Sequence, residues 1–253
     1  MPTLFISDLH LSKDRPDKLQ LFYEFIARSA RHADALYILG DLFEMWLGDD
    51  DTTPPNAEIL DSLASLGKNG TPLFVMRGNR DFLMGSRFQA TTGCKLLPDP
   101  SVVMLYGVRT LLMHGDLLCT KDVEYQALRR RVTRPEWQQA FLRQPLPERR
   151  ALANQLRATS VQAVRDKALD ITDVEPAAVE ATMAKHNVSR LIHGHTHRPA
   201  VHDFTIRGDR AERIVLGDWY VDDKVLVCDE NRQRLMPATE VIADCTHRCY
   251  ARP

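Results

Sequence analysis

Five apolar stretches of this chain each end in a short polar string that contains aspartate, histidine or asparagine. In chain order the strings are SDLH, GDLFE, GNRD, HGD and GHTH. Each apolar stretch is a short run that is typical of a buried strand. In open α/β sheets, ligands bind outside the carboxyl ends of the strands. We therefore expect the five strings to meet at one place, which limits the fold to an α/β architecture with a shared site.

Helical patterns alternate with these strands. Apolar residues recur at helical spacing over residues 19–31 and 57–66. A hairpin-like stretch, VVMLYGVR, precedes the fourth strand, and the later strands AVHDFTI, AERIVLGDW and KVLVCDE follow one another without a helix between them. Strands that alternate with helices, followed by an antiparallel-looking run, predict an α/β sandwich.

Residues 122–167 interrupt this alternation. The segment has no strand signal, and its prolines separate basic helical stretches. From residue 121 to residue 167 there are eleven Lys or Arg against five Asp or Glu, a net charge of +6 in a chain whose total is −1. Such a local excess indicates an anionic ligand or surface. We interpret the segment as a helical insertion; a solvated surface subdomain is the alternative.

Composition excludes several classes of protein. The chain has 253 residues, 44% of them hydrophobic, which is an ordinary globular composition. No apolar run reaches the ~20 residues of a membrane span, and the N-terminal stretch lacks the pattern of a signal peptide. The five cysteines are odd in number and scattered, which argues against a disulfide framework and favours the cytoplasm.

The residue types in the five strings suit one chemistry. Taken singly, an Asp after a strand is more often a turn or helix cap, and GNRD is more often a tight turn. Together the strings supply a mixed set of imidazole, carboxylate and amide ligands, too many for one tetrahedral zinc. Such a set suits two first-row ions that share a bridging carboxylate: manganese, iron or zinc. The candidate ligands are Asp8, His10, Asp41, Asn79, His114, His195 and His197.

This series resembles the calcineurin-like metallophosphoesterase superfamily over about residues 3–228. The fuller strings FISDLHL, ILGDLFEMWLGDD, MRGNRDFLMG, LMHGDLLCTKDVEYQALRR, IHGHTHRP and VLGDWY resemble its manganese-dependent branch that hydrolyses UDP-2,3-diacylglucosamine in lipid A biosynthesis. The resemblance implies a four-layer α/β/β/α sandwich with a helical cap. Residues 1–121 and 168–253 would form the core, and residues 122–167 the cap.

The resemblance also implies how the ligands divide. Two Mn²⁺ are expected, with iron or zinc as alternatives, and Asp41 would bridge them. One ion would be held by Asp8, His10, Asp41 and His197. The other would be held by Asp41, Asn79, His114 and His195.

Substrate contacts follow from the same resemblance. Asn79, Arg80 and His195 would meet the phosphates, with Arg80 and His195 as the catalytic pair. The sugar nucleotide and its acyl groups would contact Asp122, Ser160, Val164 and Lys167. Val164 departs from the family pattern. The family can have a polar residue that contacts the substrate at this position, whereas a valine side chain makes no hydrogen bond.

The implied reaction is attack of water at the α-phosphorus, which yields UMP and 2,3-diacylglucosamine 1-phosphate. Many superfamily members have a histidine where this chain has Arg80. Arginine cannot donate a proton near neutral pH, but it can hold phosphate oxygens with two hydrogen bonds. The site is therefore expected to favour a leaving group that needs no proton and to act poorly on alkyl phosphate monoesters. Equal rates on both substrates would contradict this hypothesis.

Two alternatives stay open. The chain could be a phosphoesterase that acts on a soluble nucleotide, or a scaffold of the same fold that only binds. A binding scaffold would be expected to have lost ligands, whereas all seven are present. For the lipid substrate we expect a monomer at the cytoplasmic face of the bacterial inner membrane. It would associate peripherally, with the basic cap near anionic lipid and no nucleic-acid partner.

Overall fold

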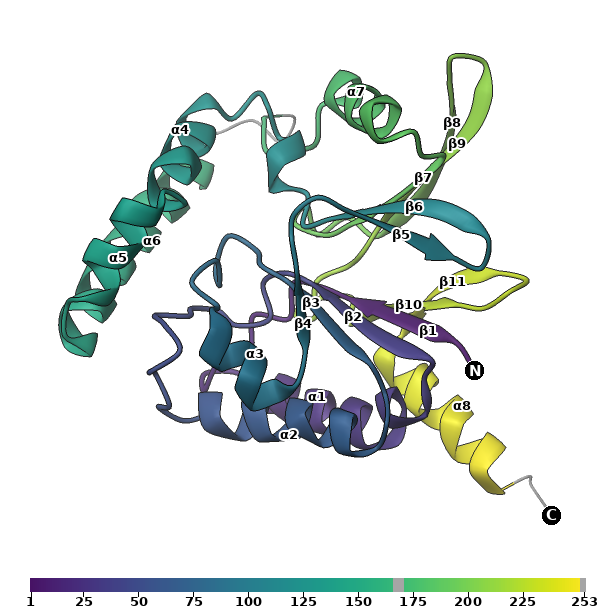
Figure 1. Ribbon diagram of the computed structural model, residues 1–253, viewed down its shortest axis with the longest axis horizontal. Helices are drawn as coiled ribbons and strands as arrows, with labels where there is room; N and C mark the ends of the chain where they lie inside the picture. The colour runs from purple at the N-terminus through teal and green to yellow at the C-terminus, as the bar shows by residue number, and fades with distance from the viewer. Residues whose placement is uncertain (166–170, 251–253) are drawn as a thin grey trace.

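The strands form two sheets that pack face to face (Figure 1). The computed structural model describes residues 1–165 and 171–250, with side chains for residues 1–157 and 171–244. The first sheet has the order β11-β10-β1-β2-β3-β4, and the second has the order β5-β6-β7-β9-β8. The strands of the first are β1 (Thr3–Ile6), β2 (Ala35–Leu39), β3 (Leu73–Met76), β4 (Lys95–Leu97), β10 (Lys224–Cys228) and β11 (Gln233–Pro237). The strands of the second are β5 (Ser101–Leu105), β6 (Val108–Met113), β7 (Arg190–His193), β8 (Ala200–Ile206) and β9 (Asp209–Val215).

Helices cover the outer faces of both sheets, which makes four layers. The first sheet is covered by α1 (Pro16–Arg28), α2 (Asn56–Lys68), α3 (Ser86–Thr92) and α8 (Ala238–Tyr250), and the second by α7 (Pro176–His186). Short 3₁₀ turns lie at η1 (Ala30–His32) and η2 (Asp116–Leu118). Three apolar clusters correspond to the three interfaces: helices on the first sheet, sheet on sheet, and α7 on the second sheet. The predicted α/β sandwich is confirmed.

Parallel pairing places the polar strings at one edge. β1, β2 and β3 are parallel neighbours, with Phe5 opposite Tyr37 and Tyr37 opposite Phe74. In the second sheet β6, β7 and β9 are parallel. Parallel strands need a crossover, and α1, α2 and α7 supply it. The carboxyl ends of β1, β2, β3, β6 and β7 therefore face the same side of the sandwich.

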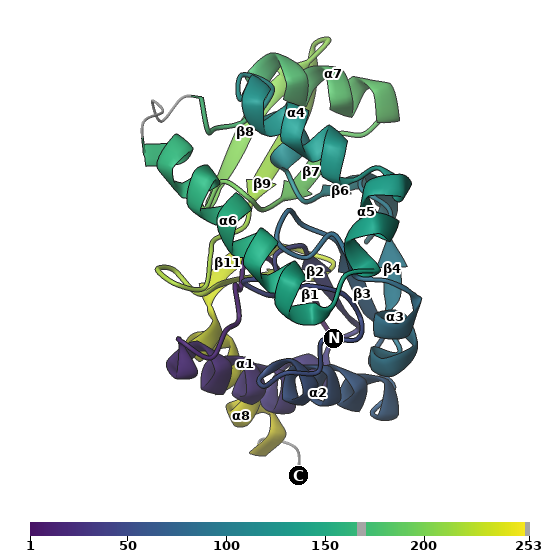
Figure 2. The same ribbon diagram turned by 90° about the vertical axis from the view of Figure 1, so that its left-hand side faces the viewer.

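Three further helices stand over that side, and we call them the cap helices: α4 (Val123–Val132), α5 (Pro135–Leu142) and α6 (Leu146–Arg165). Asp122 caps α4, since its side chain accepts a hydrogen bond from the N–H of Tyr125 at 3.0 Å. Pro135 begins α5, where its missing N–H costs nothing. Figures 1 and 2 show the cap helices beside the sandwich layers, with α6 crossing in front of them in Figure 2.

The sequence patterns missed several elements. α1 begins at Pro16, three residues before the expected start, because proline is well suited to a first helical turn. α3 and β4 are only 7 and 3 residues long. In α7 the buried side chains are only Val179 and Met183, so no broad apolar stripe marks the helix. The weakly patterned tail forms β11 and α8.

Of the helices in the described part of the chain, none is both long and apolar enough to cross a membrane.

Candidate metal centre

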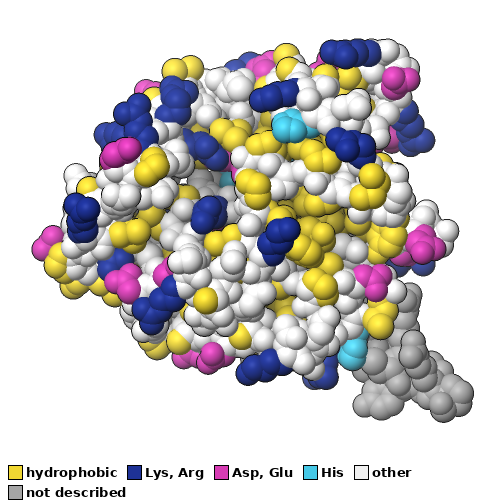
Figure 3. All heavy atoms as spheres, in the orientation of Figure 1, with side chains coloured by type: hydrophobic (Ala, Val, Ile, Leu, Met, Phe, Trp, Pro, Cys, Tyr) yellow, Lys and Arg dark blue, Asp and Glu magenta, His cyan; other side chains and the backbone are white. Residues whose placement is uncertain are grey.

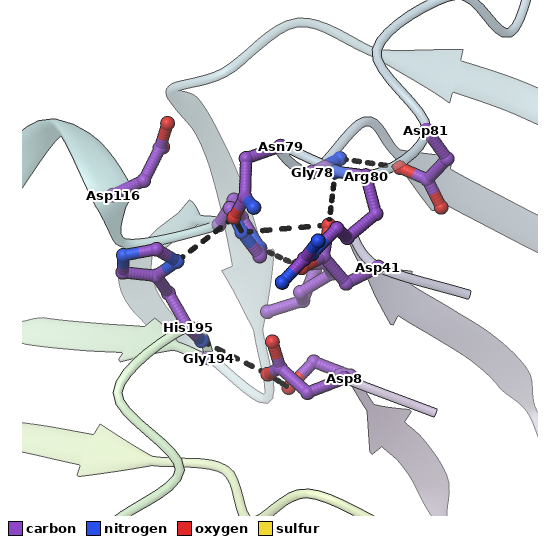
Figure 4. Close-up of polar contacts among 12 residues, drawn as sticks. Asp8, Asp41, Gly78, Asn79, Arg80, Asp81, Asp116, Gly194 and His195 are labelled. Carbon is purple, nitrogen blue, oxygen red and sulfur yellow. Dashed lines mark hydrogen bonds and ion pairs between the residues drawn. The ribbon is translucent and has the colours of Figure 1, made fainter. Parts of the chain in front are cut away.

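The polar strings converge where the two sheets meet at their carboxyl ends. Asp8 follows β1, Asp41 follows β2, and Asn79 follows β3. His114 follows β6, and His195 follows β7. Figure 4 shows the loops around Asp8, Asp41, Asn79 and His195 directed at one another. The structure thus brings together side chains as far apart in the sequence as those of Asp8 and His197.

One side of this centre is formed by Asp8, His10 and His197, whose ligand atoms lie within 4.8 Å of one another. Nε2 of His10 lies 3.3 Å from Nε2 of His197, and that nitrogen lies 3.4 Å from Oδ1 of Asp8. The second oxygen of Asp8 accepts hydrogen bonds from the Ser7 hydroxyl at 2.6 Å and the His195 N–H at 2.9 Å. One carboxylate oxygen is therefore fixed by the fold, and the other faces the two imidazoles.

The other side holds Asp41, Asn79, His114 and His195. Oδ1 of Asn79 lies 2.9 Å from Nε2 of His114 and 3.0 Å from Nδ1 of His195. The opposite nitrogen of His114 contacts the carbonyl of Leu39 at 2.9 Å, which orients the ring. All seven candidate ligands thus lie in one compact centre.

Asp41 stands between the two sides. Its Oδ2 lies 3.9 Å from Nε2 of His10, and its Oδ1 lies 3.8 Å from Nε2 of His114. Asp8, Asp41 and His114 also have ligand atoms within 4.8 Å of one another. Asp8 therefore belongs both to this group and to the group that it forms with His10 and His197. The two oxygens of Asp41 nevertheless face opposite sides, which is the arrangement a bridging carboxylate needs.

The backbone at these positions is unusual. Five of the seven candidate ligands have a positive φ, between 48° and 69°. They are Asp8, His10, Asp41, His195 and His197. Residues other than glycine seldom adopt this left-handed conformation, and clusters of it occur at functional sites where the surrounding fold maintains the strain.

Two glycines allow the loops to approach so closely. A Cβ atom at Gly78 would collide with the carboxylate of Asp41, and one at Gly194 would collide with Ser7 and Asp8. Only glycine fits at these two points.

Four carboxylates outside the candidate ligand set support the centre. Asp81 accepts hydrogen bonds from the N–H of Gly78 at 2.7 Å and of Leu42 at 2.8 Å, which joins the loops after β2 and β3. Asp116 holds the cap helix α4.

The other two supports are Glu44 and Asp218, neither of which is among the sequence-predicted site residues. Glu44 lies 3.3 Å from Nδ1 of His10, and Asp218 lies 3.3 Å from Nδ1 of His197. Asp218 follows the apolar run of β9, as the candidate ligands follow their strands. A search for polar residues after apolar runs could therefore have found it. Carboxylates in such places orient histidines and raise their basicity.

The imidazoles of the centre are shifted in opposite directions, since burial and the neighbouring His114 lower the pKa of His195 to about 4. Burial lowers the pKa of the His114 imidazole, but Asp41 and Asp8 outweigh it and raise that pKa to about 9. Burial and the neighbouring Asp41 raise the pKa of the Asp81 carboxyl to about 7. The donors are imidazole, carboxylate and amide atoms without a thiolate, a set that fits divalent first-row ions.

A cavity of about 160 Å³ extends from this centre beneath the cap helices. Asn79 and Arg80 line its polar end. Its apolar end is lined by Phe82, Leu128, Val132, Trp137, Phe141 and Leu156. Nε of Arg80 is buried and has no hydrogen-bond partner among the residues that the structure describes.

The remaining candidate substrate residues lie in or after the cap helices. Asp122 is 7% exposed and caps α4, a role that the sequence reasoning did not foresee. Ser160 and Val164 lie on α6, but their side chains are outside the described part. Lys167 lies outside the described residues altogether.

The family model for calcineurin-like phosphoesterases matches residues 1–199. Together with the fold, this match shows that the chain belongs to the calcineurin-like phosphoesterase family and is an enzyme of that class. Within this family it is similar to proteins named UDP-2,3-diacylglucosamine hydrolase, as the sequence resemblance indicated. The relative from Aeromonas salmonicida is 52% identical over 240 residues, which is 94% of both chains. The relative from Aeromonas hydrophila is 50% identical, over 93% of this chain and 98% of the relative. The relative from Stenotrophomonas maltophilia is 49% identical, over 91% of this chain and 96% of the relative.

Proposed function

We propose that this enzyme hydrolyses the diphosphate bond of UDP-2,3-diacylglucosamine, with water attacking the α-phosphorus. The products are UMP and 2,3-diacylglucosamine 1-phosphate, an intermediate of lipid A biosynthesis. The observation that carries this proposal is the cavity that joins the candidate metal centre to an apolar space beneath the cap helices. The names of the relatives at about half identity support the same substrate.

The two ends of the cavity match the two parts of this substrate. At the polar end, the Arg80 guanidinium and the Asn79 amide suit a diphosphate. At the apolar end, the rings of Trp137 and Phe141 stack with centroids 5.1 Å apart, and Phe82 lies 6.2 Å from Trp137. Acyl chains gain free energy when such a surface removes them from water, at about 0.8 kcal/mol for each buried CH₂. A soluble nucleotide would leave the apolar end unused.

Two divalent ions are part of the proposal. Asp8, His10 and His197 would hold one, His114, Asn79 and His195 the other, and Asp41 would serve both. Bound ions would lower the pKa of water and neutralise charge on the phosphoryl oxygens. Manganese is the ion we propose, with iron or zinc as alternatives, because all three accept mixed imidazole and carboxylate ligands.

Residues of the chain itself orient the substrate. The Arg80 fork would hold phosphate oxygens of both the substrate and the transition state. His195 would contribute both as a ligand and as a catalytic neighbour of the phosphates, and the backbone N–H of His195 is committed to Asp8. In our proposal Asp122, Ser160, Val164 and Lys167 contact the sugar nucleotide and acyl groups, and residues 122–167 form the cap over a core of residues 1–121 and 168–253.

The surface of the cap helices suits a membrane interface. Figure 3 shows Lys and Arg side chains interspersed with hydrophobic ones over the region of α4, α5 and α6 on its left side. Val123 is 68% and Leu142 is 41% exposed on α4 and α5. Basic groups near anionic lipid contribute about 1 kcal/mol each. We propose peripheral association of a monomer with the cytoplasmic face of the inner membrane, where a diacylated substrate resides.

A product assay tests the function. The purified chain with Mn²⁺ and UDP-2,3-diacylglucosamine is expected to release UMP and the lipid monophosphate in equal amounts. Release of UDP, or no reaction while a soluble nucleotide is cleaved, would favour the alternative phosphoesterase.

A further inference from the structure

Arg129, in the last turn of α4, contacts the buried Asp116 and the partly buried Asp99, which lie on different loops. Its Nε donates a hydrogen bond to Oδ2 of Asp116, and one of its terminal nitrogens lies 3.9 Å from Oδ2 of Asp99. Asp116 follows β6, on the loop that carries His114, and Asp99 lies between β4 and β5. One guanidinium therefore ties a cap helix to the loops of both sheets.

Asp116 depends on a cation because it is removed from water, and Asp99 lies near the same guanidinium without a hydrogen bond to it. The Asp116 side chain is 1% exposed, and the Asp99 side chain is 9% exposed. Loss of one partner from a buried ion pair leaves an uncompensated charge, which costs more than the pair itself contributes. The planar fork of arginine can serve two carboxylates at once, whereas lysine is a single point of charge.

The same face of α4 makes further contacts with the loop after β6. The Tyr125 hydroxyl donates a hydrogen bond to Oδ2 of Asp116 at 2.6 Å. The Gln126 amide donates to the carbonyl of Asp116 at 2.7 Å and to that of Cys119 at 3.2 Å. Side chains at Tyr125, Gln126 and Arg129 share one side of the helix and fasten it at three points.

This attachment reaches the candidate metal centre. The ring centroid of Tyr125 lies 5.9 Å from that of His195. Tyr125 and Arg129 also line the cavity together with Asn79 and Arg80. A shift of α4 would therefore change the shape of the polar end of the cavity, where the phosphates of the proposed substrate lie.

We propose that Arg129 is a positioning residue. By bridging Asp99 and Asp116 it fixes α4 over the metal centre and sets Tyr125 beside His195. This inference rests on the proposed function for its substrate, but its geometry does not depend on that function.

Three variants test it: Arg129→Ala, Arg129→Lys and the matched control Arg130→Ala. Arg130 lies on the same helix and is exposed, and its replacement by alanine removes the same charge. Each variant is assayed with UDP-2,3-diacylglucosamine and with bis(p-nitrophenyl) phosphate, a small diester that needs the metal centre but not the cap. Arg129→Ala is expected to lower kcat/KM for the lipid by up to about 100-fold, because a shift of α4 misplaces the bound phosphates. It should leave the rate on the small diester close to that of the wild type. On the lipid, Arg129→Lys should show an intermediate kcat/KM, and Arg130→Ala should show the wild-type value.

An equal loss on both substrates would indicate a general structural role and overturn the proposal, as would an unchanged rate on the lipid. Hydrogen exchange of the α4 amides supplies a readout that needs no substrate. The expected result is faster exchange over residues 123–132 in Arg129→Ala than in Arg130→Ala. If the wild-type chain did not cleave the lipid, the proposed function would fail, but the exchange result would still test whether Arg129 attaches α4. Equal exchange in Arg129→Ala and Arg130→Ala would overturn the positioning role of Arg129.

Discussion

The backbone N–H of Arg80 donates a hydrogen bond to Oδ1 of Asp41 at 2.8 Å. The residue after Asn79 is thus anchored by its main chain to the carboxylate that stands between the two sides of the metal centre. Its guanidinium is left to line the cavity. Because the backbone and the side chain of Arg80 have separate tasks, the side chain can be changed without removing the anchor.

Arg80→Ala is expected to lower kcat by about 10²–10³-fold, since the phosphate clamp acts on charge that develops in the transition state. KM should change less than kcat. Steady-state kinetics with UDP-2,3-diacylglucosamine measures both constants. Arg80→Lys is the matched variant, because it keeps the charge and loses the fork. A wild-type kcat in Arg80→Ala would remove Arg80 from the mechanism.

Asp218 is expected to set metal affinity through His197. Oδ1 of Asp218 accepts hydrogen bonds from the N–H groups of Tyr220 and Val221, both at 2.7 Å, which directs its other oxygen to Nδ1 of His197. Asp218→Ala should raise the Mn²⁺ concentration needed for half-maximal activity by about 10- to 100-fold. Asp222→Ala, on the same loop, serves as control. Identical Mn²⁺ titrations for both variants would argue against this role.

Trp137 is expected to determine acyl-chain binding. Its indole stacks on Phe141 and faces the cavity. Loss of a buried aromatic contact of about 1.5–3 kcal/mol corresponds to a KM about 10- to 150-fold higher for Trp137→Ala. For a substrate analogue with short acyl chains, the increase in KM caused by Trp137→Ala should be smaller. Gln139→Ala, on the exposed side of α5, should behave as wild type; a similar KM in both variants would place the acyl chains elsewhere.

The basic cap predicts salt-sensitive membrane association. In a sedimentation assay the chain should bind vesicles that contain anionic lipid at low salt. It should be released at about 1 M salt, where the Debye length falls to about 3 Å. Vesicles of zwitterionic lipid are the control. Recovery in the supernatant at low salt with anionic vesicles would contradict the proposed peripheral association.

The fold class and the convergence of the seven candidate ligands could be predicted from the sequence because strand ends in parallel sheets share an edge. The polar residue after each apolar run was therefore enough to place Asp8, Asp41 and Asn79 together, because β1, β2 and β3 are neighbours in one sheet. Which ions occupy the centre, and which residues touch the substrate, stay predictions.

Other contacts depend on packing that no local pattern encodes. Asp122 has the residue type and position of a helix cap, yet its place was interpreted only as a substrate contact. Glu44 is not among the sequence-predicted site residues, but it contacts His10 and also pairs with Arg157 of α6. Arg129 is one of three consecutive arginines, and only the fold shows that it alone of these is half-buried, against Asp116.

The most direct test of the account is hydrolysis of UDP-2,3-diacylglucosamine in ¹⁸O-labelled water, with mass spectrometry of both products. Attack at the α-phosphorus predicts that UMP carries the heavy oxygen and that 2,3-diacylglucosamine 1-phosphate does not. Label in the lipid monophosphate would show attack at the β-phosphorus and contradict the account, because the substrate would then lie in the opposite orientation across the metal centre.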